Sequence, residues 1–330
     1  MKWLRKKSNP ETTTENSTVI TNIGGMELGE DAVHPNLVDI AVMVEDSPQS
    51  LHDSYIINLD STVLTGDVVV PGVETLLKSL AYMRRPVYFL STNPYMHPAD
   101  FVTRLANVGI NIDAEQVFTP SRIAATYLQK EFAAAKIFAV ANQSFQEELR
   151  NRGVNLTDDE LAADVVLVSH NRDFNFEIYT KAFRALTGPR QPKLISTSMV
   201  RTRTPMGGEP EPGTRGLVRA LESATRKKLD KNLGRPDRDF LDVVFQTTGL
   251  NPEYTLFVSD SLTQDIRPVK RYGVQTALVL GGETTIEAAK AAKKKDQPNF
   301  VLDDITAIIP EYILAQMNTP ELFLLPEEQE

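Results

Sequence analysis

Short apolar runs recur along the chain from residue 54 onward, and most of them end in small polar residues. We expect strands at residues 54–60, 87–90, 136–140, 164–168, 193–197, 255–258 and 276–280. Buried parallel strands have this character, because helices cover both faces of the sheet.

Helical spacing separates these runs. Val73, Leu76, Leu77 and Leu80 follow a Pro-Gly pair at the i, i+3, i+4 and i+7 spacing of an amphipathic helix. We expect further helices at residues 98–108, 174–186 and 214–229. Strands that alternate with helices predict an α/β fold with a parallel sheet and right-handed crossovers.

The two ends of the chain carry weaker patterns. Residues 1–35 are polar and lack periodicity, so we expect a flexible tail there. Residues 40–44 predict a short helix or strand that packs on the following domain. We expect residues 313–330 to form a second, frayed tail.

Charge and composition exclude several functional classes. The chain has 330 residues and a formal net charge of −9 at pH 7, which argues against a nucleic-acid binder because phosphate backbones need a basic face. The absence of cysteine excludes disulfides, thiolate metal sites and cysteine nucleophiles. No apolar stretch is long enough to span a membrane and no secretory signal follows the basic start, so we expect a cytoplasmic protein.

Three of the expected strands end in polar triplets. These are Asn58-Leu59-Asp60, Ser91-Thr92-Asn93 and Ser259-Asp260-Ser261, and Asp265 follows shortly after the third. Ligands of an open parallel sheet bind beyond the carboxyl ends of its strands, so these side chains should meet at one edge. Strand-end turns use the same residue types, but three such triplets in one fold favour a site for Mg²⁺ and a phosphate.

The segments around these triplets resemble the four motifs of the haloacid dehalogenase (HAD) superfamily, subclass IIA. This is the group of NagD-type, 4-nitrophenylphosphatase-like and phosphoglycolate-phosphatase-like enzymes. The matching segments are INLDSTVLTGDVVVPG, FLSTN, NLGRPDRDF and FVSDSLTQDIRPVKRYGVQTALVLGG, in the family's order. The resemblance implies a Rossmann-like core at residues 36–133 and 231–312, with an α/β cap of C2 type inserted at 134–230.

The resemblance implies hydrolysis of a small phosphomonoester through an aspartyl-phosphate, with Mg²⁺ as cofactor. Asn58 stands at the position of the nucleophilic Asp, and Asp60 at that of the general acid and base. A carboxamide is a far poorer nucleophile than a carboxylate, and it also removes a negative charge from a cation site.

The remaining site residues are implied by the same match. The positions that hold the phosphoryl group carry Ser91, Thr92, Asn93 and Arg235, and those that bind Mg²⁺ carry the backbone of Asp60 with Asp260 and Asp265. Arg235 replaces the family's Lys, and its planar fork differs from a compact ammonium. Ser259 replaces a Gly, so we expect its side chain to intrude beside the metal.

The cap departs from the family pattern as well. Residues 196–200 lack the family's Asn and Asp, whereas the Pro212-Gly213 turn is kept, so the substrate contacts are expected to have changed. The four histidines lack metal-ligand spacing, and we expect them on loops or the surface, with His97 and His170 at the rim of a pocket.

We therefore expect a phosphatase-like protein whose turnover is lost or very slow, and which keeps a phosphate and Mg²⁺ site and acts by binding. Two alternatives stay open. One is an active Mg²⁺-dependent hydrolase of small sugar- or glycerol-phosphate-type esters, in which Asp60 orients water or Asn58 deamidates. The other is a structural interaction protein that works through its N-terminal tail. The resemblance also implies a homodimer formed through the cap, while the sequence identifies no protein partner.

Overall fold

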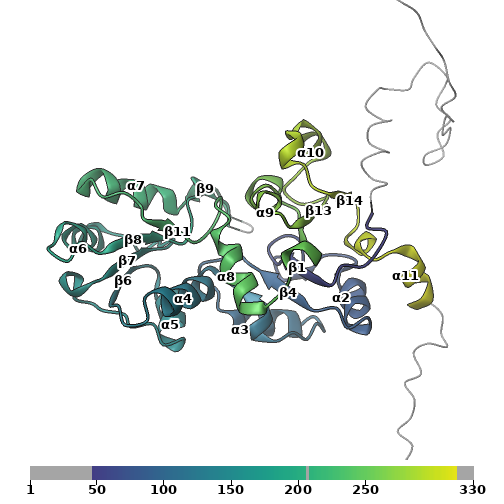
Figure 1. Ribbon diagram of the computed structural model, residues 1–330, viewed down its shortest axis with the longest axis horizontal. Coiled ribbons are helices and arrows are strands. Elements are labelled where there is room, and N and C mark those ends of the chain that lie inside the picture. The colour runs from purple at the N-terminus through teal and green to yellow at the C-terminus, as the bar shows by residue number, and fades with distance from the viewer. Residues whose placement is uncertain (1–46, 206–207, 318–330) are drawn as a thin grey trace, which may run out of the picture. The chain divides into compact units, whose positions relative to one another are not determined.

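The computed structural model describes residues 47–205 and 208–317 (Figure 1). Outside these ranges lie residues 1–35, expected as a tail, the element expected at residues 40–44, and residues 318–330 of the tail expected at 313–330.

A six-stranded parallel sheet forms the core, with β1 (Ser54–Asn58) among its central strands. Its order is β14 (Phe300–Leu302), β13 (Gln275–Val279), β12 (Thr255–Ser259), β1, β4 (Val87–Leu90), β5 (Val117–Phe118). Ile56 of β1 lies opposite Phe257 on one side and Tyr88 on the other. The carboxyl ends of β1, β4 and β12 therefore meet at one edge, where the three polar triplets follow.

Helices surround this sheet. They are α2 (Val73–Tyr82), α3 (Pro98–Ala106), α4 (Pro120–Glu131), α8 (Asp239–Thr248), α9 (Arg267–Tyr272), α10 (Ile286–Ala291) and α11 (Glu311–Met317). Short 3₁₀ turns lie at η1 (Ala114–Gln116), η2 (Glu160–Ala162), η3 (Pro252–Tyr254), η5 (Lys294–Asp296) and η6 (Ile305–Ile308), and one π-helical turn at η4 (Leu262–Ile266). The apolar spacing expected in α2 is confirmed, because Val73, Leu76 and Leu80 are buried.

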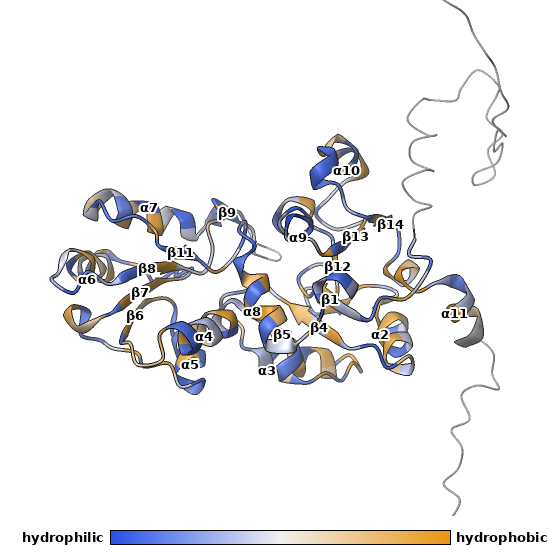
Figure 2. Ribbon diagram, viewed as in Figure 1, coloured by the Kyte–Doolittle hydropathy of each residue, from blue (hydrophilic) through white to orange (hydrophobic). Residues whose placement is uncertain are grey.

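The inserted segment builds a second parallel sheet. Its order is β11 (Lys231–Asn232), β8 (Lys193–Ser196), β7 (Val165–Val168), β6 (Ile137–Val140), with helices α5 (Gln143–Asn151), α6 (Phe176–Thr187) and α7 (Thr214–Thr225). Two hairpins complete the fold, β2 (Leu64–Thr65) with β3 (Val68–Val69) and β9 (Thr202–Arg203) with β10 (Glu211–Pro212). Figure 2 shows the strands of this sheet as mainly hydrophobic, and every residue of β7 is buried.

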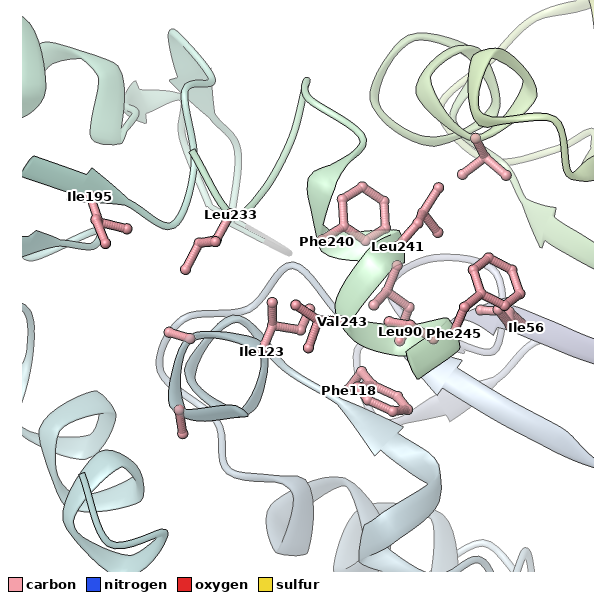
Figure 3. Packing of buried hydrophobic residues seen from close by; sticks show 14 of the residues in the cluster. Ile56, Leu90, Phe118, Ile123, Ile195, Leu233, Phe240, Leu241, Val243 and Phe245 are labelled. Atoms are coloured by element: carbon pink, nitrogen blue, oxygen red, sulfur yellow. The ribbon is translucent and has the colours of Figure 1, made fainter. Parts of the chain in front are cut away.

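One apolar cluster connects the two sheets (Figure 3). It runs from Ile56 in the core sheet through Phe240 of α8 and Ile123 of α4 to Ile195 in the inserted sheet. Burial of apolar surface is non-directional and proportional to area, so a shared cluster stabilises both parts together.

The α/β class and the parallel arrangement are as the sequence predicts, but two ends differ. The helix expected to reach residue 229 stops at Thr225, because Arg226 adopts the left-handed conformation (φ 59°) and the Glu222 carboxylate accepts the Leu229 amide. At the other end, α11 crosses the boundary expected at residue 313, where buried Ile313 joins the core.

Within residues 47–205 and 208–317, no helix combines the length and the apolar character needed to cross a membrane.

Candidate active site

A cavity of about 640 Å³ opens between the carboxyl edge of the core sheet and the inserted segment. The core contributes Asn58, Asp60 and Asp260, and the inserted segment contributes His170 and Arg203. The three polar triplets thus meet, as the sequence predicts, and two residues of each line the floor of this cavity.

Asn58 is the last residue of β1, and its side chain is buried in the floor (4% exposed). Its Nδ2 donates to the backbone carbonyl of Asp60 at 2.9 Å, while its Oδ1 has no hydrogen-bond partner within the described part of the chain. The Asn58 side chain therefore presents an N–H donor to the Asp60 carbonyl.

The Asp60 carboxylate lies against the loop that follows β4. It accepts from Ser91 Oγ at 3.0 Å, from the Thr92 amide at 2.6 Å and from Thr92 Oγ1 at 2.7 Å. A backbone amide and two hydroxyls that converge on one carboxylate make strong, charge-assisted hydrogen bonds. Ser91 and Thr92 thus form an anion cradle, and Asp60 occupies it.

Asn93, which was expected to hold a phosphoryl group, does not line the cavity. Its Oδ1 instead accepts the Tyr95 amide at 2.9 Å, and its own amide donates to Ser91 Oγ at 3.0 Å. The local turn at Asn93 shapes the cradle without facing the ligand space.

Asp260 follows β12 and is almost fully buried. Its carboxylate accepts from Thr62 Oγ1 and from the Glu283 amide, both at 2.9 Å. Burial raises the pKa of Asp260 above its usual range, against the lowering effect of these two hydrogen bonds. Gly282 is required beside it, since a Cβ there would lie 2.2 Å from Asp260 Oδ2.

Asp265 lies in η4 and forms a buried ion pair with Arg235, whose Nε donates to its Oδ1. Burial raises the pKa of the Asp265 carboxyl even though the guanidinium lowers it. The Arg235 guanidinium is thus paired with one of the acidic side chains of the cavity. The side chain of Ser259, which was expected beside the metal position, donates to Asp265 Oδ2 at 2.6 Å and so lies against one of the two acids expected to bind the ion.

The wall from the inserted segment is held by a network around Glu211. Arg172 and Arg203 each donate to the Glu211 carboxylate at 2.8 Å. His170 Nδ1 lies 2.8 Å from Tyr95 Oη, a contact that joins the two parts of the chain. Burial, with a smaller effect of nearby Arg203, lowers the pKa of His170 and favours the neutral ring.

The positions of the histidines agree only in part with those predicted from the sequence. His170 lines the cavity as expected, although it is buried and not a surface residue. His97, the other expected rim residue, lies elsewhere and contacts Ser144 Oγ at 2.9 Å and Glu148 Oε2 at 3.1 Å. His34 falls outside the described residues.

The residues present do not fit the Mg²⁺ site that the resemblance implies. A hard cation prefers several carboxylate oxygens, and within the described ranges no group of three or more acidic or histidine side chains could hold a metal. Asp260 has both oxygens engaged by the protein, and Asp265 is paired with Arg235. The Asn58 amide donates to the one backbone carbonyl expected to bind the ion.

Sequence reasoning missed three contributors to the floor. Thr62 and Glu283 hold Asp260, and Gly282 makes room for it. Of these three residues, only Gly282 could be noticed in the sequence, because it belongs to a Gly-Gly pair that follows an expected strand. Thr62 and Glu283 become neighbours of Asp260 only through the order of the strands.

Two family models match the chain. One described as haloacid dehalogenase-like hydrolase covers residues 55–155, and one described as HAD-hydrolase-like covers residues 232–308. The two matches lie on either side of most of the inserted segment.

Individual relatives agree with these models. Sugar-phosphatase AraL of Bacillus subtilis (strain 168) is 27% identical over 78% of this chain and 94% of its own length. Human glycerol-3-phosphate phosphatase is 28% identical over 78% of this chain and 90% of its own. The structure of a p-nitrophenyl phosphatase from Archaeoglobus fulgidus is similar with a TM-score of 0.72 and 26% identity, covering 81% of this chain and 100% of that protein.

Proposed function

The chain belongs to the HAD superfamily, among its phosphatases of subclass IIA, and from this premise we propose that it keeps the fold and cavity but has lost covalent phosphoryl transfer. It acts by binding a small molecule in the cavity. The observation that carries the proposal is Asn58, an amide at the end of β1, where the resemblance places the nucleophile.

The chemistry of the amide supports this proposal. Phosphoryl transfer to the protein needs an activated nucleophile, and the Asn58 Oδ1 is a neutral amide oxygen without a hydrogen-bond partner among the described residues. The Nδ2 group is engaged by the Asp60 carbonyl. Loss of a covalent nucleophile commonly reduces kcat by several orders of magnitude.

The position of Asp60 supports it as well. A general acid must reach the oxygen that it protonates, within hydrogen-bond distance or through one water. The Asp60 carboxylate is instead directed to Ser91 and Thr92, which donate to both of its oxygens. An acid and base step from Asp60 would first require these hydrogen bonds to break.

A second candidate, slow hydrolysis without a covalent intermediate, is favoured by the relatives. Those named above are a sugar-phosphatase, a glycerol-3-phosphate phosphatase and a p-nitrophenyl phosphatase. In this candidate Asp60 orients a water molecule toward a small phosphomonoester.

Phosphate release separates the two candidates. The natural chain, Asn58→Asp and the control Asn155→Asp, which changes an exposed amide of the inserted segment, are assayed with Mg²⁺ on p-nitrophenyl phosphate, glycerol 3-phosphate and sugar monophosphates. Peptide mass mapping verifies that residue 58 of the natural chain is not deamidated.

We expect no release above background from the natural chain and the control, and a gain of at least about a hundredfold from Asn58→Asp. Turnover by the natural chain close to that of Asn58→Asp would overturn the proposal in favour of the second candidate. If all three are inert, residue 58 is not the sole cause, and the altered Arg235 and the bound Asp60 account for the remainder.

A further inference from the structure

The turn at Pro94 and Tyr95, which directly follows the anion cradle, is bound by the inserted segment. The Pro94 carbonyl accepts Asn142 Nδ2 at 2.9 Å, and the Tyr95 carbonyl accepts Ser144 Oγ at 3.1 Å. Asn142 caps the N-terminus of α5, and Ser144 lies in its first turn. The turn therefore connects the floor of the cavity to the inserted segment.

The Tyr95 side chain extends this connection to the wall of the cavity. Its Oη lies 2.8 Å from His170 Nδ1 and accepts the Arg172 amide at 3.2 Å. The His170 ring meets the Tyr95 ring edge-on, with 5.6 Å between the centroids. The guanidiniums of Arg172 and Arg203 lie 5.3 and 5.6 Å from the centre of the same ring, within the range of a cation–π attraction. Tyr95 thus contacts three basic side chains of the inserted segment.

The same three side chains bind β10 through Glu211. The Glu211 carboxylate accepts from Arg172 and from Arg203, each at 2.8 Å. His170 Nε2 lies 3.5 Å from Glu211 Oε1. Because Arg203 of β9 and the neighbouring Thr204 line the cavity, this network positions part of the cavity wall.

The hydrogen-bond partners indicate a neutral His170 ring. Burial raises the pKa of Tyr95, so its hydroxyl keeps a proton to donate. The Nε2 side of the imidazole faces the Glu211 carboxylate, which accepts the ring hydrogen there. Nδ1 is then the acceptor of the Tyr95 hydroxyl, as in a neutral imidazole. Burial lowers the pKa of His170 and favours this state at neutral pH.

A proton on Nδ1 would weaken the Tyr95–His170 contact. It would place an N–H donor opposite the Tyr95 hydroxyl, whose oxygen already accepts the Arg172 amide. Among the described residues, the charged groups that face the ring are Arg172, Arg203 and Glu211, and Tyr95 is the other titratable neighbour. An imidazolium would therefore add a third positive charge to two guanidiniums that share one carboxylate.

We propose that the Tyr95–His170 contact is a pH-dependent latch, which holds β9 and β10 over the cavity at neutral pH and releases them when His170 gains a proton. Release loosens a wall of the ligand cavity, so acid regulates its access. This inference rests on the proposed function, since it assigns a control of the same cavity. The two can fail separately, because the experiment below contains no ligand and measures no phosphate release.

Hydrogen exchange of backbone amides, followed by NMR, measures this release. The reporters are the Arg172 amide, which donates to Tyr95 Oη, and the Gly213 amide, which follows β10 and donates to a backbone carbonyl at 2.8 Å. The reference is the Leu59 amide, which donates to a backbone carbonyl of the core sheet, also at 2.8 Å. Protection factors, corrected for the intrinsic effect of pH on exchange, are compared at pH 7.5 and pH 4.5.

The full-length natural chain is compared with Tyr95→Phe, His170→Asn and the control His97→Asn. His97 is a matched control because it also joins the core to the inserted segment, through contacts with Ser144 and Glu148. His170→Asn keeps an acceptor near the position of Nδ1 but cannot titrate, and Tyr95→Phe removes the donor at either pH.

In the natural chain and in His97→Asn, we expect the protection of both reporters to fall at least about fivefold from pH 7.5 to pH 4.5, the effect of about one net hydrogen bond. The reference should change less. His170→Asn should keep its reporter protection at both pH values, whereas Tyr95→Phe should show reduced protection at both. The midpoint of the change in the natural chain should coincide with the midpoint at which the His170 ring resonances titrate, a condition that needs no variant.

Reporter protection in the natural chain that is the same at both pH values would overturn the inference. So would a pH effect that persists in His170→Asn or disappears in His97→Asn, or two midpoints that differ. A loss of protection at Leu59 as large as that at the reporters would also overturn it, because the whole chain and not the hairpin would then be opening.

Discussion

The buried ion pair between Arg235 and Asp265 allows a quantitative prediction. Their side chains are 8% and 2% exposed, and Arg235→Met removes the charge while keeping most of the apolar length. Asp265 then retains the hydrogen bond from Ser259 Oγ at 2.6 Å but no counter-charge. Removal of one partner from a buried pair costs about 3–5 kcal/mol in the free energy of unfolding.

The matched control is Arg190→Met, whose partner Asp164 is bound at 2.6 Å but on the surface, with the two side chains 52% and 35% exposed. An exposed pair contributes about 0–1 kcal/mol. The assay is urea unfolding followed by circular dichroism, because the only tryptophan is Trp3, outside the described residues. At roughly 2 °C per kcal/mol, the melting temperature of Arg235→Met should fall by about 6–10 °C.

The loss of stability in Arg235→Met should also depend on pH. Burial raises the folded-state pKa of Asp265, and loss of the guanidinium raises it further, so the folded variant holds its proton to a higher pH than the unfolded chain does. Stability from that proton is present at low pH and is lost as the pH rises through the folded pKa. The difference between Arg235→Met and the natural chain should therefore shrink from pH 7 to about pH 4. A deficit equal to that of Arg190→Met, or one that is the same at both pH values, would refute this reasoning.

Three further predictions concern packing, backbone space and pH. Phe257→Ala, at a fully buried position, should lower the free energy of unfolding in urea by about 3–5 kcal/mol. Phe176→Ala, at a position that is 81% exposed, should change this free energy by less than about 0.5 kcal/mol. Similar costs for the two variants would contradict the assigned core. Gly282→Ala should lower the free energy of unfolding by about 1–3 kcal/mol, because its Cβ would meet the Asp260 carboxylate. Gly216→Ala, which has open space around it in α7, should raise the free energy of unfolding by about 0.5–1 kcal/mol. The opposite order would exclude the close approach of Gly282 to Asp260. Burial lowers the pKa of His170, so the natural chain should lose stability as the pH falls below about 6.5. In the same melting series His170→Asn should lose less stability. Equal losses in the two proteins would show that protonation of His170 does not cause the change.

The seven expected strands were predictable because each is a local apolar run, whereas strands of two or three residues, such as β5 and β14, were not expected. The run that ends at Asp60 was expected to be a strand throughout, yet β1 stops at Asn58; Leu59 is buried in the apolar core and Asp60 lines the cavity. The end of α7 was missed because the left-handed conformation of Arg226 and the reach of Glu222 to Leu229 leave no apolar signal.

Several of the residues that line the cavity could be named from the sequence, but their contacts could not. Motif resemblance brought Asp60, Arg235 and Asp265 to one edge of the sheet. That Asp60 turns to Ser91 and Thr92, and that Arg235 pairs with Asp265, depends on side-chain directions and on residues about thirty positions apart. The hydrogen bond from Ser259 to Asp265 has the same origin, because the local sequence does not show that the two side chains are neighbours.

An acid-quenched transfer experiment tests the proposal that residue 58 of the natural chain cannot accept a phosphoryl group. The natural chain and Asn58→Asp are mixed with a phosphomonoester labelled at phosphorus in the presence of Mg²⁺, quenched in acid within a single turnover, and the label retained on the protein is counted. We expect label on Asn58→Asp and none on the natural chain. Label on the natural chain that peptide mapping places at residue 58, without deamidation there, would contradict it.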